Sequence, residues 1–229
     1  MKKILPLLLA ATFSLLAETL PLENISSQEF LEIIRRPLRG QAWGEFSGTL
    51  QHKGPKGSQK APVHIRITFT DSSMHAQITL NRTLTYTLEQ IHDNARKVSA
   101  KIERPEEERP FGLFDLGLTP TDLTFAFLYW DFLEELPRDS RKMQDCRRMK
   151  LSDPNGTDTV IVWFSAKYGF PMEAQWFHKN EQKPWRTLEL KGAKQFENGL
   201  WFVKEVKLQG DKWKNLIIFD YASINPIGE

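Results

Sequence analysis

Apolar and polar side chains alternate along most of this chain. In the segment 63–70 every second residue is apolar, and after a polar break at 71–73 the same alternation resumes through residue 80. Successive side chains of a strand point to opposite faces, so this pattern predicts a hairpin with one apolar face. On that face lie Val63, Ile65, Ile67, Phe69, Met74, Ala76, Ile78 and Leu80. The pattern recurs in segments 97–103, 159–166, 172–178, 185–191, 200–208 and 216–223. The chain is therefore predicted to be mainly β.

Short turn sequences separate these segments. Asp153–Gly156 combines proline with Asn and Gly, which tolerate a positive φ, and Lys167–Pro171 and Glu197–Gly199 have similar composition. About eleven strands joined to their sequence neighbours form an antiparallel meander, and curling into an incomplete β-barrel is the simplest way for it to bury one face.

Two segments have helical patterns. Ser26 and Glu29 have the spacing of a capping box, an apolar stripe follows, and Pro37 ends the helix. The second helix is predicted over Pro120–Leu133, with Thr119 as its N-cap. Its residues from 123 on are apolar on all sides, so the helix must be covered on most of its surface. Two interpretations stay open and are compatible: a core helix, or a lid that closes an apolar cavity.

The N-terminus has the features of an export signal. Lys2 and Lys3 precede an apolar run from Ile4 to Leu16, and cleavage is expected after Ala17. Residues 18–229 then form a single domain with 29 basic and 29 acidic residues. This balance gives no basic excess to attract nucleic acid. The single cysteine, Cys146, excludes an internal disulfide, so stability depends on a hydrophobic core.

Candidate catalytic groups are sparse. The five histidines show no helical pair or close carboxylate spacing typical of a metal site, and no phosphate-binding loop or nucleophile elbow is present. Neighbouring arginines could lower the pKa of Cys146, but a structural, unreactive thiol is the alternative that we favour. We expect no enzyme activity, no metal and no cofactor.

The basic segment Arg138–Arg148 is either a patch for anionic lipid or a partner, or simply a solvated edge, which its acidic neighbours favour.

An ordered series of short motifs resembles a known family. Phe111–Leu123 precedes the aromatic segment, and Cys146–Leu151, Val160–Trp163 and Phe170–Ala174 follow in order. This series is similar to the bacterial outer-membrane lipoprotein-sorting proteins, the LolA-like family, over roughly residues 40–223. The resemblance implies an incomplete barrel of about eleven strands with two covering helices (the LolA/LolB-like fold), and a periplasmic carrier or chaperone for acyl chains.

The chain departs from the family pattern at two points. After Val160–Trp163 the family leads us to expect an acidic residue near the hairpin tip, whereas this chain has Phe164–Lys167. The arginine with which characterised carriers hold the lid closed has no clear counterpart. Arg66 lies in an early strand, but alternation points its side chain away from Ile65 and Ile67, so the role is not assigned to it.

The function expected from these observations is a monomeric periplasmic carrier. It would bind the acyl chains of lipoproteins or lipids in an apolar cavity, carry them towards the outer membrane, and exchange them with donor and acceptor proteins. The alternative is a non-enzymatic sensor of envelope stress, or an interaction module of the same fold. The residues expected to line the cavity are Ile65, Ile67, Phe69, Ile78, Leu80, Phe125, Leu128 and Phe132.

Overall fold

The structure is a computed structural model, which describes residues 22–35, 42–70, 72–92, 98–103, 105, 112–195 and 201–226. The expected export signal and the expected turn at 197–199 lie outside the described residues.

Within the described residues, twelve antiparallel strands form one continuous, open sheet. In spatial order they are β5 (Val98–Glu103), β4 (Leu84–His92), β3 (Ser73–Leu80), β2 (Gly57–Phe69), β1 (Ala42–Gly54), β14 (Lys214–Pro226), β13 (Glu205–Gly210), β10 (Arg186–Lys191), β9 (Pro171–His178), β8 (Asp158–Ser165), β7 (Gln144–Ser152) and β6 (Asp131–Arg141). A separate two-stranded sheet pairs β11 (Lys194–Gln195) with β12 (Trp201–Phe202). The predicted mainly β fold with an unclosed antiparallel sheet is confirmed.

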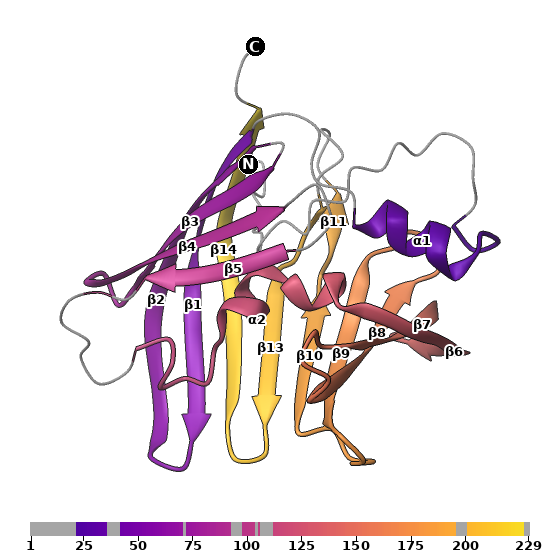
Figure 1. The fold of residues 1–229 in the computed structure, drawn as a ribbon. Helices are drawn as coiled ribbons and strands as arrows, with labels where there is room; N and C mark the ends of the chain where they lie inside the picture. Colours follow the sequence, from indigo (N-terminus) through magenta and orange to yellow (C-terminus); the bar gives the residue numbers. More distant parts are fainter. Residues whose placement is uncertain are drawn as a thin grey trace.

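β1 and β14, the first and last strands in the sequence, lie side by side in the middle of the sheet. β1 pairs with β14 from Ala42↔Pro226 to Lys53↔Lys214, so the two halves of the chain meet there. The sheet curls until its edge strands, β5 and β6, come round to the same side (Figure 1). A bulge at Ser47 and Gly48 contributes to this bend. Gly48 is required there because an added Cβ would lie 2.1 Å from the carbonyl oxygen of Ile218.

The described part of the chain has three short helical segments beside the sheet. α1 (Ser27–Ile34) has the predicted capping box between Ser26 and Glu29, and it packs on β7 and β8, where the rings of Phe30 and Phe164 meet edge to face at 5.4 Å. α2 (Pro120–Thr124) and the 3-10 helix η1 (Ala126–Tyr129) follow β5 in the chain and lie between the two edge strands (Figure 1).

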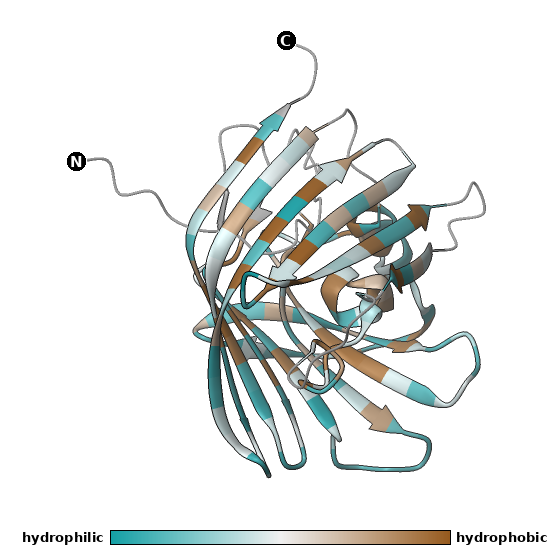
Figure 2. Ribbon diagram, turned by 90° about the vertical axis from the view of Figure 1, so that its left-hand side faces the viewer, coloured by the Kyte–Doolittle hydropathy of each residue, from teal (hydrophilic) through white to brown (hydrophobic). Residues whose placement is uncertain are grey.

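The predicted alternation accounts for the core. On β2 and β3 the inward residues alternate with exposed ones, and Figure 2 shows the bands of apolar and polar residues along the strands. Ile65 pairs with Ile78, and both are almost fully buried. These side chains belong to one contiguous core that also includes the apolar residues of α1, α2 and η1.

Two parts of the strand prediction are wrong. The segment 200–208 is predicted to be one strand, but it contains the whole of β12 and the start of β13, with Val203 and Lys204 between them. The predicted segments also omit β1, β4 and β6. Of these, β6 is an edge strand without regular alternation, is interrupted by two register shifts and contains Pro137. Edge strands tolerate proline and exposed positions on both faces, so they leave a weak sequence signal.

Candidate functional site

The candidate site is the apolar inner face of the sheet beneath α2 and η1. Seven of the eight residues predicted to line a cavity are buried to at least 96 %, namely Ile65, Ile67, Phe69, Ile78, Leu80, Phe125 and Leu128. The structure brings them into a single core. The eighth, Phe132, is partly buried and packs against the same core.

The covering segment, which consists of α2, Phe125 and η1, is not the single helix over Pro120–Leu133 that the sequence predicts. Thr119 and Asp122 form the expected capping box, but α2 ends at Thr124 because Phe125 adopts a left-handed conformation with a φ of 53°. η1 then runs to Tyr129, and β6 begins at Asp131, so Phe132 belongs to a strand. Helix propensity and apolar composition do not encode a positive φ at a phenylalanine, which is costly for a bulky residue and must be held by its surroundings.

Aromatic contacts pack η1 against the sheet. Phe127 is fully buried, and its ring meets that of Trp176 on β9 edge to face at 4.9 Å. Phe125 contacts Phe127 at 5.8 Å in the same manner. Tyr129 contacts His92 on β4 at 5.2 Å, and burial raises the pKa of Tyr129 to about 12. η1 therefore spans from one half of the sheet to the other.

Three polar side chains of the sheet hold the backbone immediately before α2. The hydroxyl of Tyr86 accepts a hydrogen bond from the amide of Leu113 at 3.1 Å. Asn215 Nδ2 donates to the carbonyl of Leu116 at 2.6 Å, and Arg186 Nη2 donates to the carbonyl of Gly117 at 2.7 Å. The three side chains that make these hydrogen bonds are buried, so water competes little with them and this end of the covering segment is firmly attached.

A buried ion pair attaches α2 itself. Arg186 on β10 pairs with Asp122, and both side chains are at least 94 % buried. The guanidinium lies within 6 Å of the ring centroids of Trp176, Trp185 and Trp213. Burial raises the pKa of Asp122, while Arg186 and the capping contacts with Thr119 favour its ionised form.

η1 is held by a different arginine, which the sequence did not reveal. Arg35, just after α1, donates from Nε to the carbonyl of Leu128 at 2.7 Å and from Nη2 to the carbonyl of Trp130 at 2.6 Å. Arg66, considered for this role from the sequence, is 69 % exposed and pairs with Glu45 on the outer face. The main-chain acceptors of Arg35 are distant in sequence and carry no residue-type signal, which is why the contact could not be predicted.

α1, which carries Arg35, is in turn fixed by Arg147. This side chain is 4 % exposed, pairs with Glu135 at 2.7 Å, and donates to the carbonyls of Leu22 and Ile25. Its guanidinium lies 4.5 Å from the ring centroid of Phe30. The covering segment is thus connected through Arg35 and α1 to β6 and β7.

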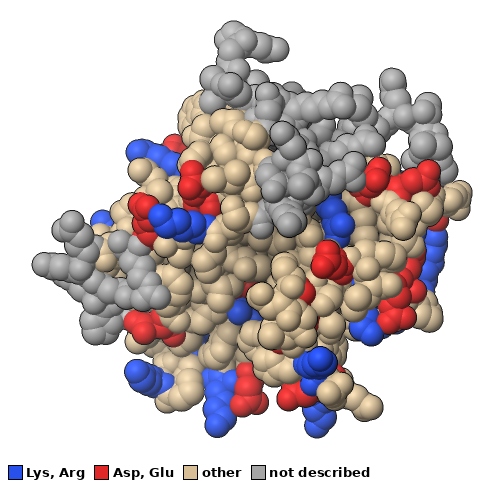
Figure 3. Space-filling model, in the orientation of Figure 1, with Lys and Arg blue, Asp and Glu red and all other residues tan. Residues whose placement is uncertain are grey.

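The basic segment 138–148 is not a uniform cationic patch. Arg138 pairs with Asp145, and Arg141 pairs with Asp139 and Glu173. Figure 3 shows Lys and Arg side chains interspersed with Asp and Glu on the face that carries α2. Arg138 and Arg141 are therefore balanced by neighbouring carboxylates.

Cys146 is a buried thiol. Burial raises the pKa of the Cys146 thiol, whose sulfur lies 3.9 Å from that of Met172. Within the described ranges, no group of three or more His, Cys, Asp or Glu side chains is arranged to hold a metal ion. Nor does any helix in the part of the chain that the structure describes have the length and apolar character to cross a membrane.

Comparison with solved structures identifies the fold. A DUF1329 family protein from Desulfovibrio piger superposes with a TM-score of 0.67 at 11 % identity, with 92 % of this chain and 95 % of that chain covered. An outer membrane lipoprotein-sorting protein domain from Vibrio parahaemolyticus gives 0.60 at 12 % identity, with 89 % and 92 % covered. A LolA superfamily protein from Nitrosomonas europaea gives 0.57 at 10 % identity, with 89 % and 96 % covered.

The chain therefore has a LolA-like fold, as its sequence motifs suggested. No protein-family model matches the sequence, and no curated protein is similar to it at the sequence level. At these low identities the likeness establishes the fold alone.

Proposed function

We propose that the protein is a periplasmic carrier that binds acyl chains of lipoproteins or lipids between its sheet and the η1 segment, and carries them towards the outer membrane without catalysing a reaction. The observation that supports this most directly is the asymmetric attachment of the covering segment. The backbone before α2 is tied to the sheet by Tyr86, Asn215 and Arg186, whereas the bonds that tie η1 to α1 come from Arg35.

This asymmetry gives η1 a way to move. Phe125, with its positive φ, lies between the anchored α2 and η1, and a change in its backbone dihedrals would swing η1 away from the sheet. Loss of the two bonds from Arg35 would then uncover the inner faces of β2, β3 and β9. In this proposal the described conformation is the closed state, with Phe127 and Leu128 of η1 buried in the interior.

The energetics allow cargo to replace η1. Exposing a large apolar side chain costs about 1.5–3 kcal/mol, and burying an acyl chain contributes about 0.8 kcal/mol per methylene. About four to eight methylenes therefore offset the exposure of Phe127 and Leu128. An ordinary acyl chain is long enough to displace η1 with free energy remaining for binding.

The proposal extends to the cellular context. The export signal expected at residues 1–17 would deliver a monomeric protein to the periplasm. Donor and acceptor proteins at the two membranes would load and unload it. The fold neighbours support a carrier class, and the cargo is here proposed to be any ligand that presents acyl chains.

Native mass spectrometry of gently purified protein tests the proposal. We expect bound phospholipid, fatty acid or lipopeptide, and a fluorescent fatty acid should bind to delipidated protein. Ile78→Thr, which puts a hydroxyl on the buried wall, should weaken this binding at least several-fold. Gln77→Thr, on the exposed side of the same strand, is the matched control and should not. Protein that is repeatedly empty and does not bind the fluorescent fatty acid would overturn the proposal.

A further inference from the structure

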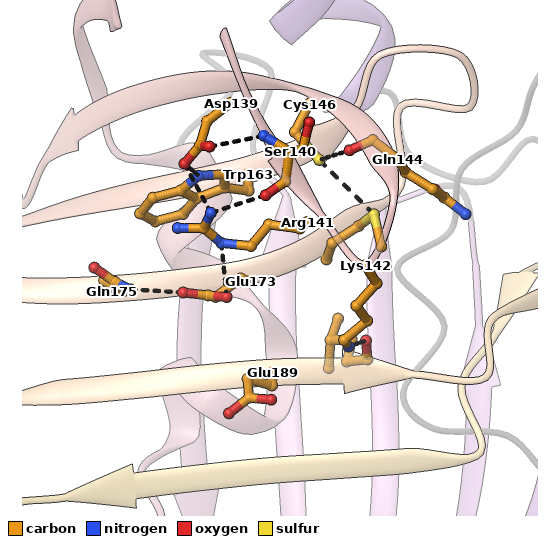
Figure 4. A network of polar contacts seen from close by, with 12 residues as sticks. Asp139, Ser140, Arg141, Lys142, Gln144, Cys146, Trp163, Glu173, Gln175 and Glu189 are labelled. Carbon is orange, nitrogen blue, oxygen red and sulfur yellow. Dashed lines mark hydrogen bonds and ion pairs between the residues drawn. The ribbon is translucent and has the colours of Figure 1, made fainter. Parts of the chain in front are cut away.

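The sheet opens locally between β9 and β10. Their pairing ends at Glu173↔Glu189, and the next opposed positions, Met172 and Leu190, are not paired. The carbonyl of Leu190 instead accepts a hydrogen bond from Lys142 Nζ at 2.8 Å (Figure 4). Lys142 lies in the turn between β6 and β7. Its side chain therefore supplies the hydrogen bond to the carbonyl of Leu190 that β9 would otherwise supply.

A pocket of about 460 Å³ occupies this opening. That volume lies within the range of small-ligand sites. Its apolar floor consists of Phe170, Met172 and Leu190, each at most 8 % exposed. The polar residues of its lining are Lys142, Gln144, Ser165, Tyr168 and Lys191, of which Ser165 is buried. The pocket therefore offers cationic groups next to buried apolar surface.

The ammonium of Lys142 is available to an anion. Three carboxylates act electrostatically on Lys142, namely Glu189, Glu173 and Glu205. Glu173 pairs with Arg141, and Glu189 pairs with Lys207 and Lys191. In the described part of the chain, no carboxylate lies within ion-pair distance of Lys142. Partial burial lowers the pKa of Lys142 even though the residue as a whole is exposed, and a bound anion would offset this cost.

The turn that supplies Lys142 also presents an apolar side chain to solvent. Met143 is fully exposed, and both Lys142 and Met143 have a positive φ, of 50° and 63°. Two-residue hairpin turns of this geometry favour Asn and Gly, so Lys and Met are unusual choices there. Tyr168, on the pocket rim, is 39 % exposed. An exposed Met and Tyr beside lysines suit contact with a lipid surface.

We propose that this pocket binds the anionic head group, carboxylate or phosphate, of a lipid, with Lys142 donating to the head group and the first part of the chain lying on Phe170, Met172 and Leu190. The proposal rests on the proposed carrier function. Met172 and Leu190 continue the inward rows that include Ala174 and Leu188, so a chain that leaves the pocket is led towards the sheet interior.

The test compares oleic acid with its neutral methyl ester on delipidated full-length protein, by displacement of a fluorescent fatty acid. We expect wild-type protein to bind oleate about tenfold more tightly than methyl oleate, as one charge-assisted hydrogen bond predicts. Lys142→Met should abolish this preference and leave binding of the ester unchanged. Lys60→Met, an exposed lysine on β2, is the matched control and should keep the preference.

A second variant and a second ligand identify the site and the source of the anion. Ala193→Trp, at an exposed position on the pocket wall, should obstruct the pocket and weaken oleate binding with no effect on the fold. Inorganic phosphate alone should compete only weakly, because it has no chain. If phosphate displaces oleate as well as a lipid does, the pocket is a free-anion site and the lipid assignment is overturned.

The outcomes separate this inference from the carrier proposal. Equal binding of acid and ester by wild-type protein, or an acid preference that survives in Lys142→Met, overturns the pocket and leaves the carrier standing. Binding of oleate that depends on Lys142 but is insensitive to Ile78→Thr, together with no binding of the ester, supports the pocket and contradicts the carrier. Failure of wild-type protein to bind either ligand overturns both.

Discussion

Removal of the Arg35 guanidinium should release η1 without unfolding the sheet. Arg35→Met keeps most of the aliphatic side chain but loses the hydrogen bonds to the carbonyls of Leu128 and Trp130. A hydrogen bond from a charged group contributes about 1.5–3 kcal/mol. Because Arg35 is partly exposed, solvent reduces this, and we take about 2 kcal/mol for the two bonds together. Opening of η1 should become roughly 30-fold more frequent.

Hydrogen exchange measures this opening directly. The amides of Leu128 and Trp130 are protected within η1 by bonds to the carbonyls of Phe125 and Phe127. In Arg35→Met they should exchange roughly 30-fold faster, in proportion to the opening equilibrium, while amides of the central strands β1 and β14 keep their rates. Added fatty acid should slow exchange in the inner strands that η1 uncovers.

Arg66→Gln is the matched control. It removes an arginine that pairs with Glu45 on the outer face and should leave η1 exchange unchanged. Unaltered amide exchange of η1 in Arg35→Met would refute the reasoning. An equal acceleration of exchange in η1 and in the central strands would also refute it, because Arg35 would then stabilise the whole fold and not the closed position of η1.

Three further predictions concern stability. Arg186→Met leaves a buried carboxylate unpaired and should lower the free energy of unfolding by about 3–5 kcal/mol in urea titrations, whereas Lys150→Met, which breaks a more exposed pair, should cost under about 1 kcal/mol. Cys146→Ala should lower the free energy of unfolding by about 1 kcal/mol and leave lipid binding intact. The Cys146 thiol of the folded protein should resist Ellman's reagent because it is buried. Reaction at the rate of a free thiol would contradict this. Burial lowers the pKa of His92 in the folded state, so the unfolded chain takes up a proton first, and stability present above about pH 6.5 should decline as the pH falls towards the folded pKa. His92→Phe, which preserves a ring against Tyr129, should make urea stability less dependent on pH between 7 and 5, and an unchanged slope would exclude His92 as the cause.

The sheet was predictable because its information is local. Alternation in 63–70 and 74–80 reports the inward row of β2 and β3 directly, and the caps at Ser26 and Thr119 report helix starts. The end of α2 was not predictable, since the positive φ of Phe125 is imposed by packing and not by its residue type.

The contacts that control the candidate site are non-local, and this is why the sequence did not reveal them. Arg35 reaches carbonyls more than ninety positions away, and Lys142 reaches the carbonyl of Leu190. A carbonyl acceptor can belong to any residue, so neither partner leaves a motif. The opening between β9 and β10 lies where β9 is irregular: its register with β8 shifts between Glu173 and Pro171, so Met172 has no pairing partner in β8 or in β10.

The central claim is that acyl chains bind to the inner face of the sheet. Photo-crosslinking with a fatty acid that carries a diazirine near the end of its chain tests it most directly. After irradiation and peptide mapping, labels should concentrate on inward residues of β2 and β3, such as Ile67 and Ile78, and on η1, and excess unlabelled fatty acid should abolish them. Labels confined to the outward residues of these strands, or labels that excess fatty acid does not displace, would contradict the claim.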